Sequence, residues 1–256
     1  MTDVKKAHAT TAICGYDADH ICIRGKDLVH DIMGHYSFTE LLILQALGRE
    51  STEMQNRIVD SVMVAIMEHG LVPSAIAARL TLHGAPESFQ GAVAAGLLGI
   101  GDRYAGTASE CGEILERIVA TAKASRKAKS VDEVEAYRQR GRPVPGFGHP
   151  IHEQADPRVD RLLEIATDAG ASGDYMDAMK LLESTLREVT GKPLVTNISA
   201  AIAAVLGEAG VPSSLMRGIV LTARCAGLAG HLLEETENPA AHDMWQAAQS
   251  VVDYQD

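Results

Sequence analysis

Apolar residues recur at spacings of three and four along most of this chain, and this periodicity is the feature that most limits its fold. Such spacing places apolar side chains on one face of an α-helix. The alternation typical of strands is confined to residues 11–25. Of the 256 residues 46% are hydrophobic but only 4% are aromatic, so the core must be mainly aliphatic, and alanine and leucine are strong helix formers. We therefore predict an all-α protein with a short N-terminal β-hairpin.

The expected elements follow from the pattern. The hairpin spans residues 11–25, with its turn at 16–19. Helices are predicted at 28–32, 37–47, 52–69, 73–82, 89–100, 107–129, 132–140, 157–169, 175–190, 197–209, 215–235 and 239–252. Ser37 and Glu40 form a capping-box pattern at the start of one helix, and Gly48 is a suitable end for it.

Charge and cysteine content exclude several classes of function. The net charge of −11 argues against nucleic acid as the main partner, because phosphate binding needs a clustered positive surface. Residues 1–10 are polar and no run of eighteen apolar residues occurs, so we expect a soluble cytoplasmic protein with no membrane contact. Cys14, Cys22, Cys111 and Cys225 lie far apart, so they are interpreted as reduced thiols, and no metal site is expected.

The most informative segment is the run at 144–150. Glycine and proline around Phe147 force a tight turn just before His149, which should place the imidazole on a rigid loop with exposed backbone amides. Arg158 follows nine residues after the histidine, and a guanidinium can bind a carboxylate at two points. An ordinary connecting loop, with Arg158 capping a helix, is the alternative interpretation.

Taken together, the run at 144–150 and the Asp-Pro-Arg sequence ending at Arg158 resemble the small-domain signature of the citrate synthase superfamily, in particular its short members related to citryl-CoA lyase. The resemblance extends over nearly the whole chain. It implies a large helical domain formed by residues 1–106 and 206–256, and a small helical domain inserted at 107–205. It also implies an active site between the two domains and a homodimer or higher homo-oligomer.

Further segments carry the same resemblance. His69 lies in a Glu-His-Gly sequence similar to the family's Asp-His-Gly, and Arg224 lies in a sequence similar to the helix that brings another arginine to the substrate. The resemblance thus implies that Arg158 and Arg224 bind substrate carboxylates. It implies that His69 and His149 are catalytic, and that coenzyme A contacts Gly146, Phe147 and Gly148. His231, further along the Arg224 helix, is interpreted as structural.

Three positions depart from the family pattern. Tyr104 stands where a histidine polarises the acyl carbonyl, although a phenol can also donate a hydrogen bond to an enolate oxygen. Ser199 stands where the family has its acid–base aspartate, and an unaided serine cannot abstract an α-proton from a thioester. Glu153 lies where a basic residue often meets a phosphate of coenzyme A. Basic residues at 123–129 or 138–142 would have to compensate for it.

These residues predict an enzyme that makes or breaks a C–C bond in a carboxylated 3-hydroxyacyl-CoA, releasing or using a 2-oxo acid. Catalytic roles are predicted for His69, Tyr104, His149 and Ser199, with a coenzyme A thioester as substrate and no tightly bound cofactor. Two alternatives stay open. One is an enzyme of the same fold that acts on an oxo or hydroxy acid without coenzyme A, as a retro-aldolase, decarboxylase or hydrolase. The other is a non-catalytic ligand-binding homologue.

Overall fold

The computed structural model describes residues 9–102, 106–148, 156–192 and 194–255. The chain divides into two compact units, Met1–Asn56 and Arg57–Asp256, and the division falls within helix α2 (Glu53–Ile66). The boundaries predicted for a large domain at 1–106 and 206–256 and a small one at 107–205 stay a prediction.

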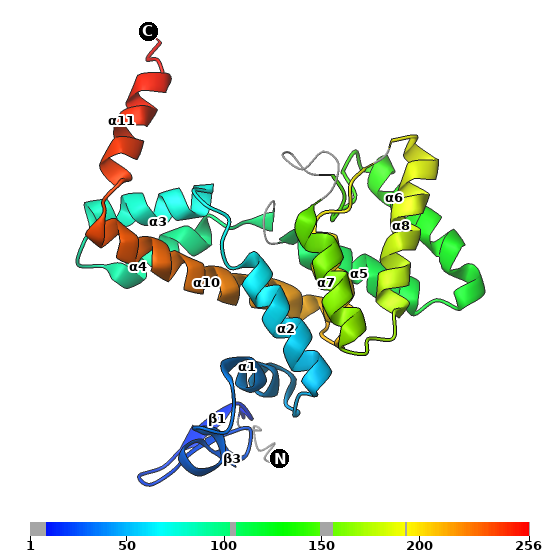
Figure 1. The fold of residues 1–256 in the computed structure, drawn as a ribbon, viewed down its shortest axis with the longest axis horizontal. Helices are drawn as coiled ribbons and strands as arrows, with labels where there is room; N and C mark the ends of the chain where they lie inside the picture. The colour runs from blue at the N-terminus through cyan, green and yellow to red at the C-terminus, as the bar shows by residue number, and fades with distance from the viewer. Residues whose placement is uncertain (1–8, 103–105, 149–155, 193, 256) are drawn as a thin grey trace, which may run out of the picture. The chain divides into compact units, whose positions relative to one another are not determined.

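The first unit contains a small antiparallel sheet with strand order β1-β2-β3 (Figure 1). The strands are β1 (Cys14–Tyr16), β2 (Ile21–Ile23) and β3 (Lys26–Asp27). The predicted hairpin is confirmed as β1 and β2, which pair antiparallel, and the structure adds a third strand that was not predicted. Arg24 and Gly25 both have left-handed backbone angles, with φ of 52° and 82°, and these turn the chain back to form β3. A strand of two residues is too short to show an alternating pattern.

Helix α1 (Phe38–Leu47) of this unit begins and ends where its sequence predicts. The Ser37 hydroxyl accepts a hydrogen bond from the Glu40 amide at 3.2 Å, and the Glu40 carboxylate accepts one from the Ser37 amide at 2.7 Å. Gly48 ends the helix in the left-handed conformation. The segment predicted as a helix at 28–32 is a π-helical turn, η1 (Leu28–Ile32).

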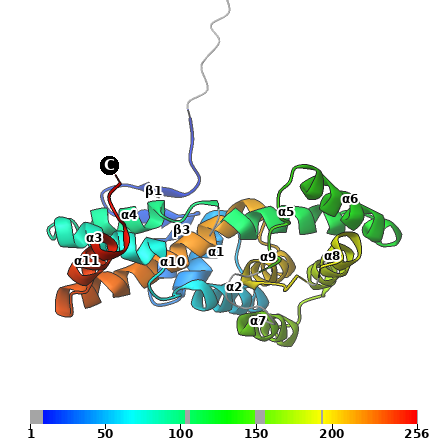
Figure 2. The same cartoon turned by 90° about the horizontal axis from the view of Figure 1, so that it is seen from above.

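Helix α9 (Ile198–Glu208) lies at the centre of one helical group of the second unit (Figure 2). Its neighbours are α5 (Thr107–Val119), α7 (Pro157–Asp168), α8 (Asp174–Thr190) and α10 (Ser213–Glu237). Every residue of α9 from 200 to 206 is at most 1% exposed to solvent. Four of them are alanines, and their small side chains let four other helices approach closely.

A second group of this unit consists of α3 (Pro73–Gly84) and α4 (Phe89–Leu98), which lie side by side, with α10 against both (Figure 1). A Cβ atom at Gly96 would lie 2.7 Å from Leu228 Cδ1 on α10 and 3.0 Å from the Ser74 carbonyl oxygen on α3, so glycine lets α4 pack closely against both helices. Helix α11 (Ala241–Val251) contacts α3. These helices confirm the predicted all-α class.

The single helix predicted at 107–129 is wrong, because the chain breaks between α5 and α6 (Arg126–Gln139). A 3₁₀ turn, η3 (Lys123–Ser125), separates the two helices. The Arg126 guanidinium donates to the backbone carbonyls of Val119 and Thr121, at 3.0 Å and 3.3 Å. It thereby satisfies carbonyl groups that the end of α5 leaves without a partner.

No single helix in the described part of the chain is long and apolar enough to cross a membrane, and only α9 and α10 together, bent by 119°, meet the length and composition required. Burial of α9 is typical of a core helix.

Candidate active site

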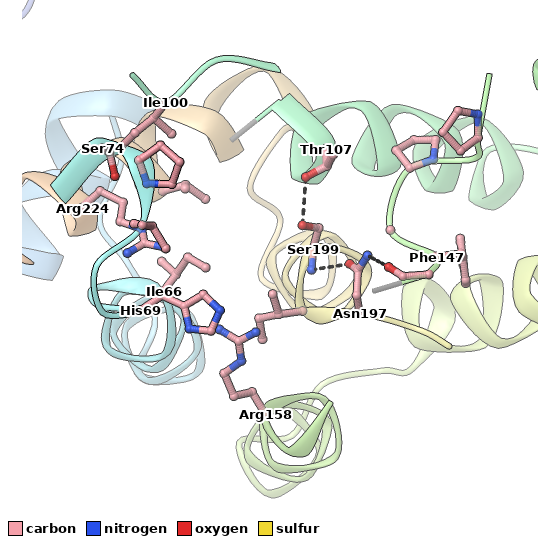
Figure 3. A pocket seen from close by; sticks show the side chains of 18 of the residues that line it. Ile66, His69, Ser74, Ile100, Thr107, Phe147, Arg158, Asn197, Ser199 and Arg224 are labelled. Atoms are coloured by element: carbon pink, nitrogen blue, oxygen red, sulfur yellow. Dashed lines mark hydrogen bonds between the residues drawn. The ribbon is translucent and has the colours of Figure 1, made fainter. Parts of the chain in front are cut away.

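A cavity of about 790 Å³ in the second unit is lined by the first turns of four helices (Figure 3). Ser74 lines it from α3, Thr107 from α5, Arg158 from α7 and Ser199 from α9, and Arg224 enters from the middle of α10. Neither α3 nor α5 has a side-chain cap on its first backbone amides. Helix N-termini carry partial positive charge, so this convergence favours an anionic ligand.

Arg158 is held in place by a buried carboxylate. Asp156 is the N-cap of α7, and its side chain is 0% exposed. Its two oxygens accept from Arg158 Nε at 3.0 Å and Nη2 at 2.9 Å, and one also accepts from the Ile198 amide at 3.2 Å. A guanidinium has five N–H groups, so this pairing leaves the other edge of Arg158, formed by Nη1 and Nη2, for a carboxylate of the substrate.

Arg224 has no comparable partner. It is half-buried on α10, and it makes no hydrogen bond or ion pair with the residues that the structure describes. Burial lowers the pKa of its guanidinium, the charge of Glu68 opposes that shift, and the like charge of Arg158 adds to it. No described residue that lines the cavity is acidic. A ligand carboxylate would therefore supply the negative counter-charge that Arg224 does not find among the described residues.

His69 lies on the segment that follows α2, and its side chain also lines the cavity (Figure 3). The prediction that the helix extends through this histidine is wrong, because α2 ends at Ile66. The His69 backbone amide donates to the Glu68 carboxylate at 2.7 Å, and Gly70 adopts a left-handed conformation with φ of 69°. These local bonds replace the helical ones and turn the chain toward α3.

Ser199 pairs with a second hydroxyl. Its Oγ lies 2.9 Å from Thr107 Oγ1, and both residues line the cavity (Figure 3). Asn197 caps α9 by accepting from the Ser199 amide at 2.9 Å, and its side-chain amide donates to the Gly148 carbonyl at 2.8 Å. Two hydroxyls therefore occupy the position for which the resemblance implies a carboxylate. They can donate hydrogen bonds, but a hydroxyl pair is not a base near neutral pH.

The loop at 144–148 is fixed by backbone pairing with the segment before α9. Phe147 forms an antiparallel bridge with Thr196, and the Gly148 amide donates to the Val195 carbonyl at 2.7 Å. The expectation of an exposed amide is therefore wrong at Gly148, because that group is already bonded. Gly146 has φ of 92°, and a Cβ there would lie 2.7 Å from Ala200 Cβ. The cavity is lined by Gly146, Phe147 and Gly148, and their contact with coenzyme A stays a prediction.

The basic residues expected to compensate for Glu153 are mostly neutralised by carboxylates. Ion pairs of 2.7–3.6 Å join Lys123 and Arg126 to Asp174, Lys127 to Glu188, Lys129 to Glu133, Arg138 to Glu135, and Arg142 to Glu110. The pairs of Lys123, Lys127, Arg138 and Arg142 are exposed, and pairs of that kind are worth only about 0.2–1 kcal/mol each, whereas Arg126 and the Glu133 partner of Lys129 are mostly buried.

Three residues of the sequence prediction lie outside the described residues. They are Tyr104, His149 and Glu153. Their predicted roles, and those of His69, Ser199, Arg158 and Arg224, stay predictions.

Comparison with known proteins places this geometry in a family. Residues 7–242 match the family model of the citrate synthase C-terminal domain. The chain belongs to this family. A citrate synthase of Heyndrickxia coagulans is 24% identical over 213 residues, which make up 79% of this chain and 53% of that protein. The chain spans about half the length of the citrate synthases that it matches.

Solved structures of this family share the fold. The citryl-CoA lyase of Hydrogenobacter thermophilus has a TM-score of 0.85 and 29% identity, and the match covers 97% of this chain and 94% of that one. An ATP citrate lyase of Methanosaeta concilii, solved in complex with (3S)-citryl-CoA, has a TM-score of 0.76 and 20% identity, over 98% of this chain and 42% of that one. The resemblance to the citrate synthase superfamily and to citryl-CoA lyase is thus confirmed.

Sequence reasoning missed several residues of this family member's cavity. Thr107 and Asn197 line it, Asp156 holds the Arg158 side chain, and Glu68 accepts from the backbone amide of His69. One signal was available, since an aspartate directly before proline and arginine is typical of a helix N-cap. Nothing in the sequence pairs Thr107 with Ser199, because the contact joins two different helices.

Proposed function

We propose that this protein makes or breaks a C–C bond in a carboxylated 3-hydroxyacyl-CoA thioester, with a 2-oxo acid as product or co-substrate. The observation that carries the proposal is the pair of guanidiniums, Arg158 and Arg224, on one cavity whose described lining holds no acidic residue. A carboxylate fits that environment, because it satisfies the free edge of Arg158 and the unpaired Arg224. The likeness to citryl-CoA lyase supports the reaction class.

In the cleavage direction, the substrate hydroxyl loses its proton and the bond between its carbon and the thioester α-carbon breaks. The hydroxyl carbon becomes the carbonyl of the 2-oxo acid, and the electron pair passes to the thioester as an enolate, which then takes up a proton at carbon. Arg158 and Arg224 bind the departing oxo acid. His69 and Tyr104 stabilise the enolate oxygen by donating hydrogen bonds.

The proton from the substrate hydroxyl needs an acceptor. Ser199 cannot serve, because its hydroxyl bonds to Thr107 and the described lining of the cavity holds no carboxylate that would activate it. We assign this role to His149, since a neutral imidazole accepts a proton near neutral pH.

A direct assay tests the proposal. Purified protein is mixed with citryl-CoA, and released oxaloacetate is measured by its reduction with malate dehydrogenase and NADH. Turnover that falls by at least about tenfold in Arg224→Gln, with the control Arg161→Gln unchanged, would support the assignment. Arg161 is an exposed residue on α7 that pairs with Glu164 at 3.1 Å. Wild-type protein without turnover of citryl-CoA or related thioesters would contradict it.

The ion pairs of the basic residues favour the alternative of a substrate without coenzyme A. Calorimetry with coenzyme A at low and physiological salt separates the two. Sub-micromolar affinity supports the thioester reaction, whereas no heat at millimolar coenzyme A favours a retro-aldolase, decarboxylase or hydrolase of a free oxo or hydroxy acid. Binding of oxo acids without any turnover would favour the non-catalytic homologue.

We further propose that the protein is cytoplasmic and forms a homodimer or a higher homo-oligomer, as the family resemblance implies. Light scattering coupled to size-exclusion chromatography tests the oligomeric state, and a monomer at micromolar concentration would contradict it.

A further inference from the structure

One face of α10 carries three polar side chains and a glycine at helical spacing. Arg224, Gly227, His231 and Glu235 follow one another at intervals of three, four and four residues, so they lie in one stripe along the helix. Arg224 lines the cavity. The other three residues contact α3 and the segment that carries His69.

Two residues of this stripe, Glu235 and His231, contact a buried arginine of α3. Arg79 on α3 is 2% exposed, and its Nη1 donates to Glu235 Oε2 at 2.8 Å. Its Nε and Nη2 lie 3.1 Å and 2.9 Å from His231 Nδ1. A guanidinium only donates hydrogen bonds, so Nδ1 must accept, and the proton of the neutral imidazole is on Nε2.

The Nε2 atom lies close to Glu68. Its distance to Glu68 Oε1 is 3.0 Å, but the contact is not aligned as a hydrogen bond, and Nε2 has no hydrogen-bond partner in the described part of the chain. Glu68 also accepts from the His69 amide at 2.7 Å. Burial acts to raise the pKa of the Glu68 carboxyl, but the contact with His231 and the hydrogen bonds from backbone amides outweigh it and hold that pKa below its usual value. An ionised Glu68 thus joins His231 to the backbone of His69.

Close packing fixes the same segment from a second direction. A Cβ atom at Gly227 would lie 2.2 Å from the Met67 carbonyl oxygen and 3.0 Å from Glu68 Oε2. The backbone before His69 therefore lies directly on α10, and glycine is required at this position of the stripe.

We infer that His231 is a positioning residue that holds the Glu68–His69 segment at a fixed place relative to Arg224 on the same helix. Arg79 sets the tautomer of His231, His231 then directs Glu68, and Glu68 holds the His69 amide. The functional meaning of His69 rests on the proposed function, whereas the positioning itself is a property of the resting protein. His231 thus acts through its polar contacts as well as by filling space.

Two substitutions at His231 separate positioning from space filling. His231→Gln keeps one acceptor and one donor in the same side chain, whereas His231→Leu fills the volume and provides neither. We expect His231→Gln to bind oxaloacetate within about threefold of wild type and His231→Leu at least about tenfold more weakly, as measured by calorimetry, because the apolar side chain removes the acceptor for Arg79 Nε and the polar neighbour of Glu68 Oε1. His242→Gln, at an exposed histidine of α11, is the matched control.

Nuclear magnetic resonance of protein with ¹⁵N-labelled histidine tests the inference without any ligand. We expect His231 to show a protonated Nε2 and an unprotonated Nδ1, and the His69 ring signals, assigned with His69→Gln, to move in His231→Leu but not in His231→Gln. A protonated Nδ1, or His69 signals and oxaloacetate affinity that stay unchanged in His231→Leu, would overturn the inference. If wild type binds no oxo acid, the proposed function fails while these spectra still decide the positioning role. If His231→Leu does not fold, the positioning role is decided by two measurements, the tautomer of His231 in wild type and the His69 ring signals of His231→Gln.

Discussion

The side-chain oxygens of Thr107 and Ser199 lie 2.9 Å apart, at the first turns of α5 and α9. Only one hydroxyl proton can lie between the two oxygens, so the pair keeps a second proton that it can donate to a ligand. Donation to a substrate oxygen is thus open to this pair, and proton abstraction is not.

Ser199→Ala is expected to lower turnover of the natural substrate by less than about tenfold, because loss of a true general base costs on the order of 10²–10⁴ in rate. Steady-state kinetics on citryl-CoA measures this effect, with Thr107→Val as the second variant of the pair. A loss as large as that caused by His149→Ala would show that Ser199 takes part in proton transfer.

Asp156→Asn should both destabilise the protein and weaken binding of a 2-oxo dicarboxylate. Breaking the pair with Arg158 is expected to cost about 3 kcal/mol of unfolding free energy, the lower end of the range for buried pairs, because Arg158 keeps some contact with solvent. Urea denaturation gives the free energy, and calorimetry with oxaloacetate gives the affinity.

The matched control for Asp156→Asn is Glu164→Gln, which removes an exposed pair on the same helix and should change stability by less than about 1 kcal/mol. Equal effects of the two substitutions would show that Asp156 does not hold Arg158.

Gly146→Ala is expected to destabilise the protein by roughly 2–4 kcal/mol, since the new methyl group meets Ala200 and the backbone is left-handed. Gly170→Ala is the control, because Gly170 has a similar φ of 89° but nothing within 4 Å of its Cβ position. Its cost should be limited to about 1 kcal/mol of backbone strain. Thermal unfolding of both variants checks the difference, and similar midpoints would mean that the loop at 144–148 shifts easily away from α9.

Acid should destabilise the protein in part through Glu133. Hydrogen bonds from Arg117, at 2.8 Å each, and a further contact with Lys129 hold the pKa of Glu133 below its ordinary value of 4.5, although burial opposes this. A carboxyl with a depressed pKa contributes stability that is complete above its unfolded value and is lost as the pH falls through its folded value.

The unfolding free energy of wild type should therefore fall more steeply below about pH 4.5 than that of Glu133→Gln, and the two should differ most at neutral pH. Urea titrations between pH 3 and pH 7 measure this. Parallel pH profiles would show that the pairing with Arg117 contributes nothing to folding.

Sequence periodicity located most of the helices, although it extended one past the end of α2, because each helical segment shows its 3.6-residue repeat independently of its neighbours. It failed at β3, which is too short to show a pattern, and between α5 and α6, where Arg126 ends one helix through bonds to its last turn. Both failures involve backbone groups whose partners a repeat does not show.

Only those residues of the site that lie within family motifs could be predicted. They led to Arg158, Arg224 and Ser199, which line one cavity. Supporting contacts such as that between Glu68 and His231 join residues far apart in the sequence, and no local pattern marks them. The bonded amide of Gly148 was missed for the same reason, since its acceptor lies in the segment before α9.

The unpaired guanidinium of Arg224 has a consequence for the lifetime of the protein as well as for its chemistry. A half-buried cation with no counter-ion among the described residues makes the empty protein less stable than its fold would otherwise allow. Under the proposed function, a carboxylate bound to Arg224 removes this deficit, so occupancy and resistance to unfolding are expected to rise together by mass action. On that proposal, a cell rich in the acid is expected to hold more intact protein than a starved one, with no change in its synthesis.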